Sequence, residues 1–75
     1  KNDLTQVPMI IEWAENSLLS YPALGYYQML TDAYKSLGDV DNRCRIASEG
    51  VALYTQSRYL WKVLDDCPER VQYDD

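Results

Sequence analysis

Few side chains in this 75-residue sequence have the chemistry of an active site. There is no histidine, so the side chain that most often serves as a general base near neutral pH is missing. Glu12 and Glu15 stand three residues apart, which places two carboxylates on one face of a helix, where such a pair can act as acid and base. A solvated acidic face is the more common role of two such residues, and we expect no enzyme.

An acidic stretch in the middle of the chain, DVDNRCRIASEG, has the first two acidic positions of a calcium-binding loop, at Asp39 and Asp41. Arg43 then takes the fifth position, where an oxygen ligand is needed, and Gly50 takes the place of the closing glutamate. The two aspartates are better interpreted as helix caps, and the chain has no glycine-rich phosphate loop. We therefore expect no metal site and no cofactor.

The two cysteines, Cys44 and Cys67, permit either a disulfide bond or two buried thiols. Two cysteines do not make the disulfide framework of a small secreted domain, and without histidine they do not make a structural zinc site. We favour buried thiols, and with them an intracellular location. A compact four-helix structural or regulatory domain, crosslinked by Cys44 and Cys67, is the alternative.

The net charge of −5 argues against a general nucleic-acid binder, because phosphate binding depends on lysine and arginine. Four basic residues could nevertheless form a local strip: Arg43, Arg45, Arg58 and Lys62. We favour a solvated face with a few ion pairs. No run approaches the roughly 20 apolar residues of a membrane-spanning helix. The sequence thus predicts neither a nucleic-acid partner nor a membrane.

Apolar residues recur every three or four positions in four segments, at about 8–21, 23–37, 40–54 and 57–66. No segment alternates with period two for long enough to indicate a strand. The length allows one small domain or a fragment, residues 1–75, with a polar tail at 68–75. We predict an all-α fold of four helices, antiparallel because their connections are short.

The stretch SLGDVD is predicted to be a tight corner rather than a domain hinge. Leu37 and Val40 are three residues apart and both belong to apolar stripes. Gly38 stands where a helix ends in a left-handed residue, and Asp39 or Asp41 can cap the next helix.

The order of residues around this corner resembles one tetratricopeptide (TPR) repeat. Tyr27, Leu30 and Tyr34 match its first aromatic, leucine and tyrosine, and LGD at 37–39 matches its turn. Pro22 matches the proline that commonly closes a preceding repeat. The resemblance covers one full repeat at about 24–55, with flanking helices at about 8–21 and 57–66.

The sequence also departs from the TPR pattern: no proline closes the repeat near Thr55, and three further positions differ. Thr31 stands where glycine or alanine is usual, Arg43 near the alanine that opens the second helix, and Gly50 where alanine is common. A glycine inside a helix costs about 1 kcal/mol relative to alanine. Close approach by another helix at Gly50 is a plausible compensation.

The resemblance implies a right-handed stack of helical hairpins whose concave side holds a partner peptide or helix. Carried over position by position, the groove-facing residues are Gly25, Gln28, Met29, Asp32, Lys35 and Ser36. Gln28 and Asp32 do not match the lysine and asparagine with which some TPR domains grip a terminal carboxylate, so that clamp is not expected. The alternative is that these side chains merely face solvent or pack on the neighbouring helix. We expect a non-catalytic protein–protein interaction scaffold that binds a peptide or helix, or associates with itself.

The aromatic residues are seven tyrosines and two tryptophans, without phenylalanine. Such residues suit half-wet surfaces, where the ring packs and the polar tip stays solvated. Tyr26, Tyr59 and Trp61 lie off the best apolar stripes, so we expect them at interfaces.

Overall fold

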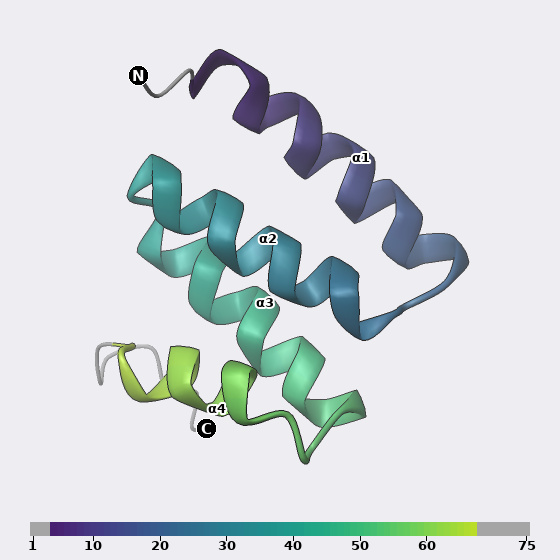
Figure 1. Ribbon diagram of the computed structural model, residues 1–75, viewed down its shortest axis with the longest axis vertical. Coiled ribbons are helices and arrows are strands. Elements are labelled where there is room, and N and C mark those ends of the chain that lie inside the picture. The colour runs from purple at the N-terminus through teal and green to yellow at the C-terminus, as the bar shows by residue number, and fades with distance from the viewer. Residues whose placement is uncertain (1–3, 68–75) are drawn as a thin grey trace.

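Four α-helices follow one another in the part of the chain that a computed structural model describes, residues 4–67 (Figure 1). A 3₁₀ turn, Leu4–Gln6, leads into α1 (Val7–Ser20), α2 (Leu24–Leu37), α3 (Val40–Leu53) and α4 (Arg58–Asp65). Consecutive helices run antiparallel (Figure 1), as their short connections require. The all-α prediction is confirmed, and no residue between 4 and 67 lies in a strand. The expected tail at 68–75 lies outside the described residues.

Helix α2 is the centre of the structure, because it contacts α1, α3 and α4, while α4 also packs on α3. Nine buried residues form the core: Ala14, Tyr27, Leu30, Tyr34, Ile46, Ala47, Val51, Leu60 and Val63. Each fully buried leucine or isoleucine among them stabilises the fold by about 1.5–3 kcal/mol. More than one side of α2 is therefore covered by neighbouring helices.

The corner between α2 and α3 has the predicted caps. Gly38 has a φ of 73°, and the N–H groups of Gly38 and Asp39 donate to the carbonyls of Lys35 and Tyr34 at 3.0 Å each, which is the Schellman pairing. The Asp39 carboxylate accepts a bond from the backbone N–H of Asn42 at 3.3 Å. Asp39 rather than Asp41 is therefore the N-cap.

Leu37 and Val40, the apolar residues on either side of this corner, are both exposed. Their residues are 43% and 44% exposed. The cap bonds, rather than apolar burial, hold the turn between the two helices. Both positions fall at helix ends, where the facing helix no longer covers the periodic stripe.

Gly50 is buried at the place where α2 and α4 both approach α3. A Cβ atom there would lie 2.8 Å from Cδ1 of Leu60 and 2.9 Å from Cγ of Tyr27. The predicted close approach is confirmed, and it explains why this helix carries a glycine despite the propensity cost.

Cys44 and Cys67 form a disulfide bond, so the preference for two buried thiols is wrong. Their Cα atoms are 6.1 Å apart, within the range that a disulfide spans. Cys44 lies in the first half of α3 and Cys67 just beyond α4, and the antiparallel pairing of these helices brings them together. Since disulfides persist mainly in oxidising compartments, the bond also removes the ground for expecting an intracellular location.

Candidate functional site

The residues expected to face a groove lie along one side of α2. Asp32, Lys35 and Ser36 are exposed and Gln28 is half-buried, while Met29 is 38% exposed. The Ser36 hydroxyl donates to the backbone carbonyl of Asp32 at 3.3 Å, which occupies it within its own helix. Gly25 is exposed at the start of α2, and a side chain there would meet nothing within 4 Å.

Two of these residues, Asp32 and Lys35, line a hollow of about 330 Å³ between α2, α3 and α4. The other lining residues are Arg43 from α3 and Tyr59, Lys62, Val63 and Asp66 from α4 and its end. Because Asp32 and Lys35 are three positions apart, they share one face of α2. Gln28, Met29 and Ser36 do not line the hollow.

Tyr59 and Thr31 form the contact that seats α4 across α2 beside the hollow. Thr31 is fully buried and its hydroxyl donates to the carbonyl of Gln28 at 2.9 Å. The same oxygen lies 3.5 Å from the Tyr59 hydroxyl. A threonine therefore fits the position where the TPR pattern has a smaller residue, because its hydroxyl is satisfied within α2.

Five charged side chains around the hollow have no partner among residues 4–67. Asp32, Lys35, Arg43, Lys62 and Asp66 make no side-chain hydrogen bond or ion pair with another described residue. The Nε atom of Arg43 is buried and has no acceptor. Three positive and two negative groups thus give the hollow a local excess of positive charge, in a chain whose net charge is −5.

Each cysteine of the disulfide directly follows a residue that lines this hollow. Arg43 precedes Cys44, and Asp66 precedes Cys67, so the bond joins the backbone segments that carry two of the lining residues. A covalent link at this place limits how far α4 can move from α3.

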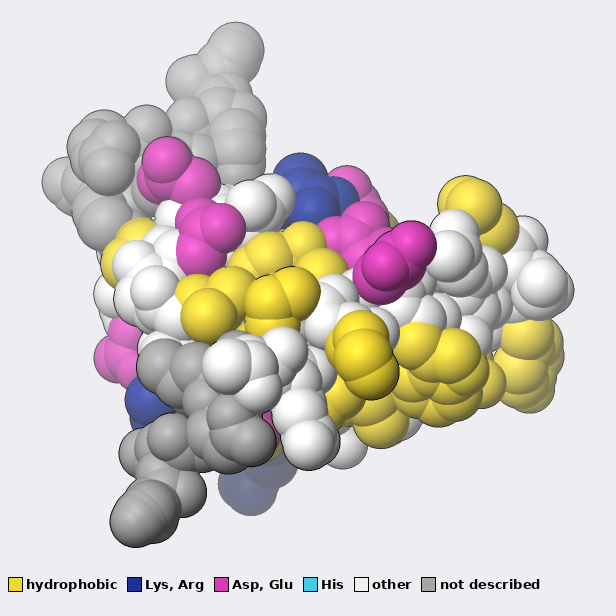
Figure 2. All heavy atoms as spheres, turned by 90° about the horizontal axis from the view of Figure 1, so that it is seen from above, with side chains coloured by type: hydrophobic (Ala, Val, Ile, Leu, Met, Phe, Trp, Pro, Cys, Tyr) yellow, Lys and Arg dark blue, Asp and Glu magenta, His cyan; other side chains and the backbone are white. Residues whose placement is uncertain are grey.

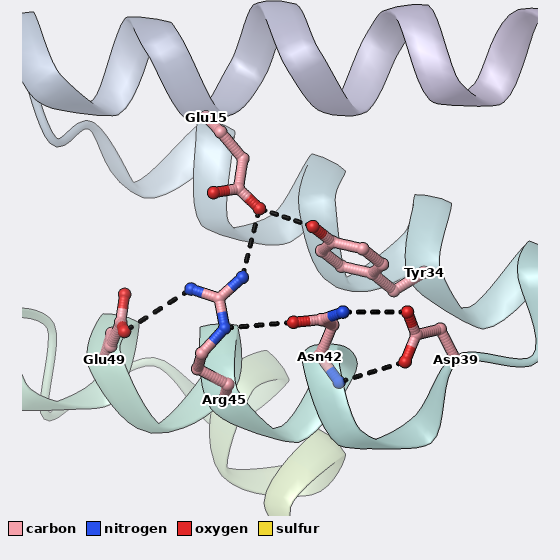
Figure 3. A network of polar contacts seen from close by, with 6 residues as sticks. All are labelled: Glu15, Tyr34, Asp39, Asn42, Arg45 and Glu49. Carbon is pink, nitrogen blue, oxygen red and sulfur yellow. Dashed lines mark hydrogen bonds and ion pairs between the residues drawn. The ribbon is translucent and has the colours of Figure 1, made fainter.

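On α3, Arg45 anchors a separate polar network that joins α1, α2 and α3 (Figure 3). Its guanidinium donates to a Glu15 carboxylate oxygen at 3.1 Å, which also accepts the Tyr34 hydroxyl. Arg45 also donates to Asn42 at 3.1 Å and pairs with Glu49 at 3.5 Å. Glu15 is therefore not a free member of a solvated acidic face, although Glu12 is exposed as expected.

This network shifts the pKa values of two of its members. Burial, followed by the hydrogen bond and negative charge of Glu15, raises the pKa of Tyr34 to about 12. Burial lowers the pKa of Arg45, but the hydrogen bond and charge of Glu15, together with Glu49 and Tyr34, raise it by more, so the net pKa lies above its usual value. The network keeps Tyr34 protonated and Arg45 charged.

The four bases proposed as one basic strip are divided between different surroundings. Arg45 is paired with Glu15 and Glu49, whereas Arg43 and Lys62 line the hollow. Arg58 is exposed at the start of α4 and is not part of the lining. The expected solvated face with ion pairs therefore describes Arg45 but not Arg43.

The three aromatic residues expected at interfaces differ in environment. Tyr26 is half-buried, with its ring 5.5 Å from that of Trp13 on α1. Tyr59 and Trp61 are 41% and 48% exposed. The indole N–H of Trp61 donates to the Thr55 carbonyl at 2.6 Å, which ties α4 to the loop before it.

Apolar side chains also remain exposed on α1. Met9, Trp13 and Leu19 are 65%, 53% and 85% exposed. Seen from the side of α1, yellow hydrophobic side chains gather over much of the surface (Figure 2). A second hollow, of about 400 Å³, lies between the start of α2 and the loop that follows α3. Its lining carries no charged side chain: Leu24, Leu53, Tyr54, Thr55, Gln56 and Ser57.

Within residues 4–67, no three histidine, cysteine, aspartate or glutamate side chains are grouped so as to hold a metal ion. None of the described helices is long and apolar enough to cross a membrane. Comparison with protein-family models, with curated proteins and with solved structures finds no match to this chain.

Sequence reasoning missed Arg43, Tyr59 and Asp66 as residues that line the same hollow as Asp32 and Lys35. One signal was present, since Arg43 stands where the TPR pattern has a small residue. A long cation in a position that faces the next helix must either be paired or reach a polar space. The residues of α4 gave no such signal, because their placement depends on how α4 docks.

Proposed function

We propose that this chain is a non-catalytic protein–protein interaction module of the TPR-like kind, which binds a peptide or helix of a partner. The observation that carries the proposal is the hollow where α2, α3 and α4 present five unpaired charged side chains. Charges that a fold leaves unpaired around a concave surface are available to fix the register of a polar ligand.

The arrangement of the helices supports this proposal. In a TPR-like stack, α2 and α4 would be successive first helices, which line the concave side. Asp32 and Lys35 come from α2, and Tyr59 and Lys62 come from α4. A hollow of about 330 Å³ accommodates a few side chains of a peptide, and the flanking exposed residue Met29 extends the contact along α2.

Selection from a random-peptide phage library against the oxidised chain tests the proposal. We expect enriched peptides that bind saturably and that lose about tenfold in affinity when Lys35→Glu reverses one charge of the hollow. Arg58→Glu is the matched control, because it makes the same charge change at an exposed residue outside the hollow. A selection without saturable binders, or binders equally weakened by both substitutions, would contradict a peptide site here.

Self-association is part of the same proposal and is supported by the exposed apolar residues of α1. Met9 and Trp13 are four positions apart and thus share a helix face. Sedimentation equilibrium over a range of concentrations measures the assembly state. If copies pair through this face, the parent chain forms a dimer and Met9→Lys shifts it to monomer. A parent chain that is monomeric at all concentrations contradicts self-association and leaves peptide binding as the proposed function.

A compact structural or regulatory domain is the second candidate, and the Cys44–Cys67 disulfide favours it. A crosslink between α3 and the end of α4 stabilises a small domain whether or not it binds a partner. The phage selection separates the candidates, because a folded, oxidised chain that yields no peptide binder supports the structural role.

A further inference from the structure

We propose that the hollow binds an oxyanion, a phosphate or carboxylate group of the ligand, on the guanidinium of Arg43 with Lys35 and Lys62 beside it. The inference deepens the proposed function and rests on it for the nature of the partner. It names the chemical group that the site recognises and the residue that recognises it.

Arg43 lines the hollow with a buried donor that has no partner. Its Nε–H is buried without an acceptor, and its guanidinium makes no ion pair with any residue between 4 and 67. A buried donor without a partner costs about 1–3 kcal/mol, so such a group in a native fold calls for an explanation. The planar donor fork of arginine matches the two oxygens of a carboxylate or phosphate.

Lys35 and Lys62 bring positive charge to the same hollow from two other helices. Lys35 lies on α2, Arg43 on α3 and Lys62 on α4. None of the three forms an ion pair with a described acidic side chain. An anion in the hollow would therefore meet three cations at once, in a partly enclosed space where charges interact more strongly than in bulk water.

The two acidic residues of the lining limit which anion fits. Asp32 and Asp66 reduce the local charge from three positive groups to a net of one. A bound cation would be repelled by Lys35, Arg43 and Lys62, so the hollow is not a cation site. The acids favour a group that carries one negative charge, and they can accept N–H groups from a peptide that surrounds it.

The disulfide gives this site a fixed frame. Cys44 follows Arg43 in α3, and its bond to Cys67 holds the end of α4, with Asp66, against that helix. A binding group whose backbone is already held loses less conformational entropy when the ligand binds. Arg43 thus reaches the hollow from a part of α3 that the disulfide holds to the end of α4.

Titration of the ¹⁵N-labelled, oxidised chain with inorganic phosphate and, separately, with acetate tests the inference by NMR. Ionic strength is held constant with chloride, because screened surface charges respond to any salt. We expect a saturable shift of the Arg43 Nε–Hε resonance, and for Arg43→Gln an affinity lower by about tenfold or more, measured on the amide of Val63. Stronger binding of phosphate or of acetate identifies which oxyanion the site prefers.

Arg58→Gln is the matched control, since it removes the same charge from an exposed position outside the hollow. If Arg43→Gln does not fold by circular dichroism, Lys62→Gln takes its place, with weaker binding again expected. Three results would overturn the inference. They are shifts that rise linearly with anion concentration, shifts that chloride reproduces, and an Arg43→Gln variant (or Lys62→Gln in its place) that binds the anion as tightly as the parent chain. None of these three results bears on whether the chain binds a peptide. Conversely, saturable binding of phosphate or acetate, together with a phage selection that yields no peptide, contradicts the proposed function and supports the oxyanion site.

Discussion

Gly50 and Tyr27 are in contact across α3 and α2 so closely that only a hydrogen fits between the glycine Cα and the tyrosine ring. A Cβ atom on Gly50 would lie 2.9 Å from Cγ of Tyr27 and 2.8 Å from Cδ1 of Leu60. Cγ is the fixed base of the tyrosine ring, so it cannot move aside without shifting the whole side chain. This contact sets the spacing of the three helices around the core.

Gly50→Ala is expected to destabilise the fold by about 1 kcal/mol, the middle of the range left when the propensity gain is subtracted from the overpacking cost. Alanine gains about 1 kcal/mol in helix propensity, but overpacking a core contact costs typically 1–3 kcal/mol and displaces both Tyr27 and Leu60. Urea unfolding followed by circular dichroism measures the difference in free energy.

Gly25→Ala serves as the matched control for this prediction. Gly25 is also a helical glycine, and a Cβ atom there would meet nothing within 4 Å. We expect equal or slightly higher stability for this variant, because the propensity gain acts alone. Equal effects of the two alanine substitutions would show that the close contact at Gly50 carries no energy.

Gly38→Val is expected to destabilise the fold by about 1 kcal/mol or more, for a different reason. A side chain at Gly38 would meet nothing within 4 Å, but φ is 73° there, and a β-branched residue resists this left-handed conformation. Thermal melting of Gly38→Val and Gly38→Asn separates the cost of the left-handed conformation from other effects of adding a side chain. Asparagine tolerates the conformation, so a similar loss in both variants would argue against a conformational origin.

Much of the fold could be predicted from the sequence because its signals are local. Apolar spacing located four helices within one or two residues at most of their ends, and the cap residues Gly38 and Asp39 marked the corner. The exposure of Leu37 and Val40 was missed, because periodicity gives the direction of a side chain but not the extent of the helix that covers it.

The candidate site depends on contacts between distant segments, and the sequence predicted it only in part. The pattern pointed to Asp32 and Lys35 on α2, whereas the residues of α4 enter the hollow through the docking of a short helix. The same docking of α4 determines whether the two cysteines meet. Their 23-residue separation in sequence is by itself compatible with a disulfide bond or with two thiols. Glu15 joined Arg45 for this reason too, across 30 positions of sequence.

Removal of the disulfide by Cys44→Ala with Cys67→Ala is expected to lower the free energy of unfolding by about 3 kcal/mol, the loop-closure value for a loop of this size. The bond ties the end of α4, an eight-residue helix, to α3. Helices this short are marginal on their own. We therefore expect the amides of Leu60 and Val63 to lose hydrogen-exchange protection before those of α2.

A thiol count in denaturant without reductant checks the premise of this prediction. Cys44 and Cys67 should give no free thiol until a dithiol reductant is added, and two afterwards. The same reductant should lower the melting temperature of the parent chain and leave the double variant unchanged. Two free thiols before reduction would contradict the disulfide.

Tyr34 predicts how stability responds to alkaline pH. Its pKa is raised to about 12 by burial and by Glu15, while an unfolded tyrosine titrates near pH 10. Below pH 10 both states keep the proton and the stabilisation is complete. Between about pH 10 and 12 the unfolded state loses its proton first, so stability falls as pH rises, by about 1 kcal/mol between pH 9 and 11 from this residue.

Tyr34→Phe isolates this effect, since it removes the titrating hydroxyl and keeps the ring in the core. Urea unfolding at pH 8, 9, 10 and 11 should show the variant less stable than the parent at pH 8, because the hydrogen bond to the Glu15 carboxylate is lost. The gap should narrow above pH 10, since only the parent loses the Tyr34 contribution there. Tyr27, whose pKa burial also raises, adds a slope common to both proteins and does not affect the comparison. Parallel curves up to pH 11 would mean that Tyr34 titrates alike in the folded and unfolded chains, and that its contact with Glu15 does not hold the proton.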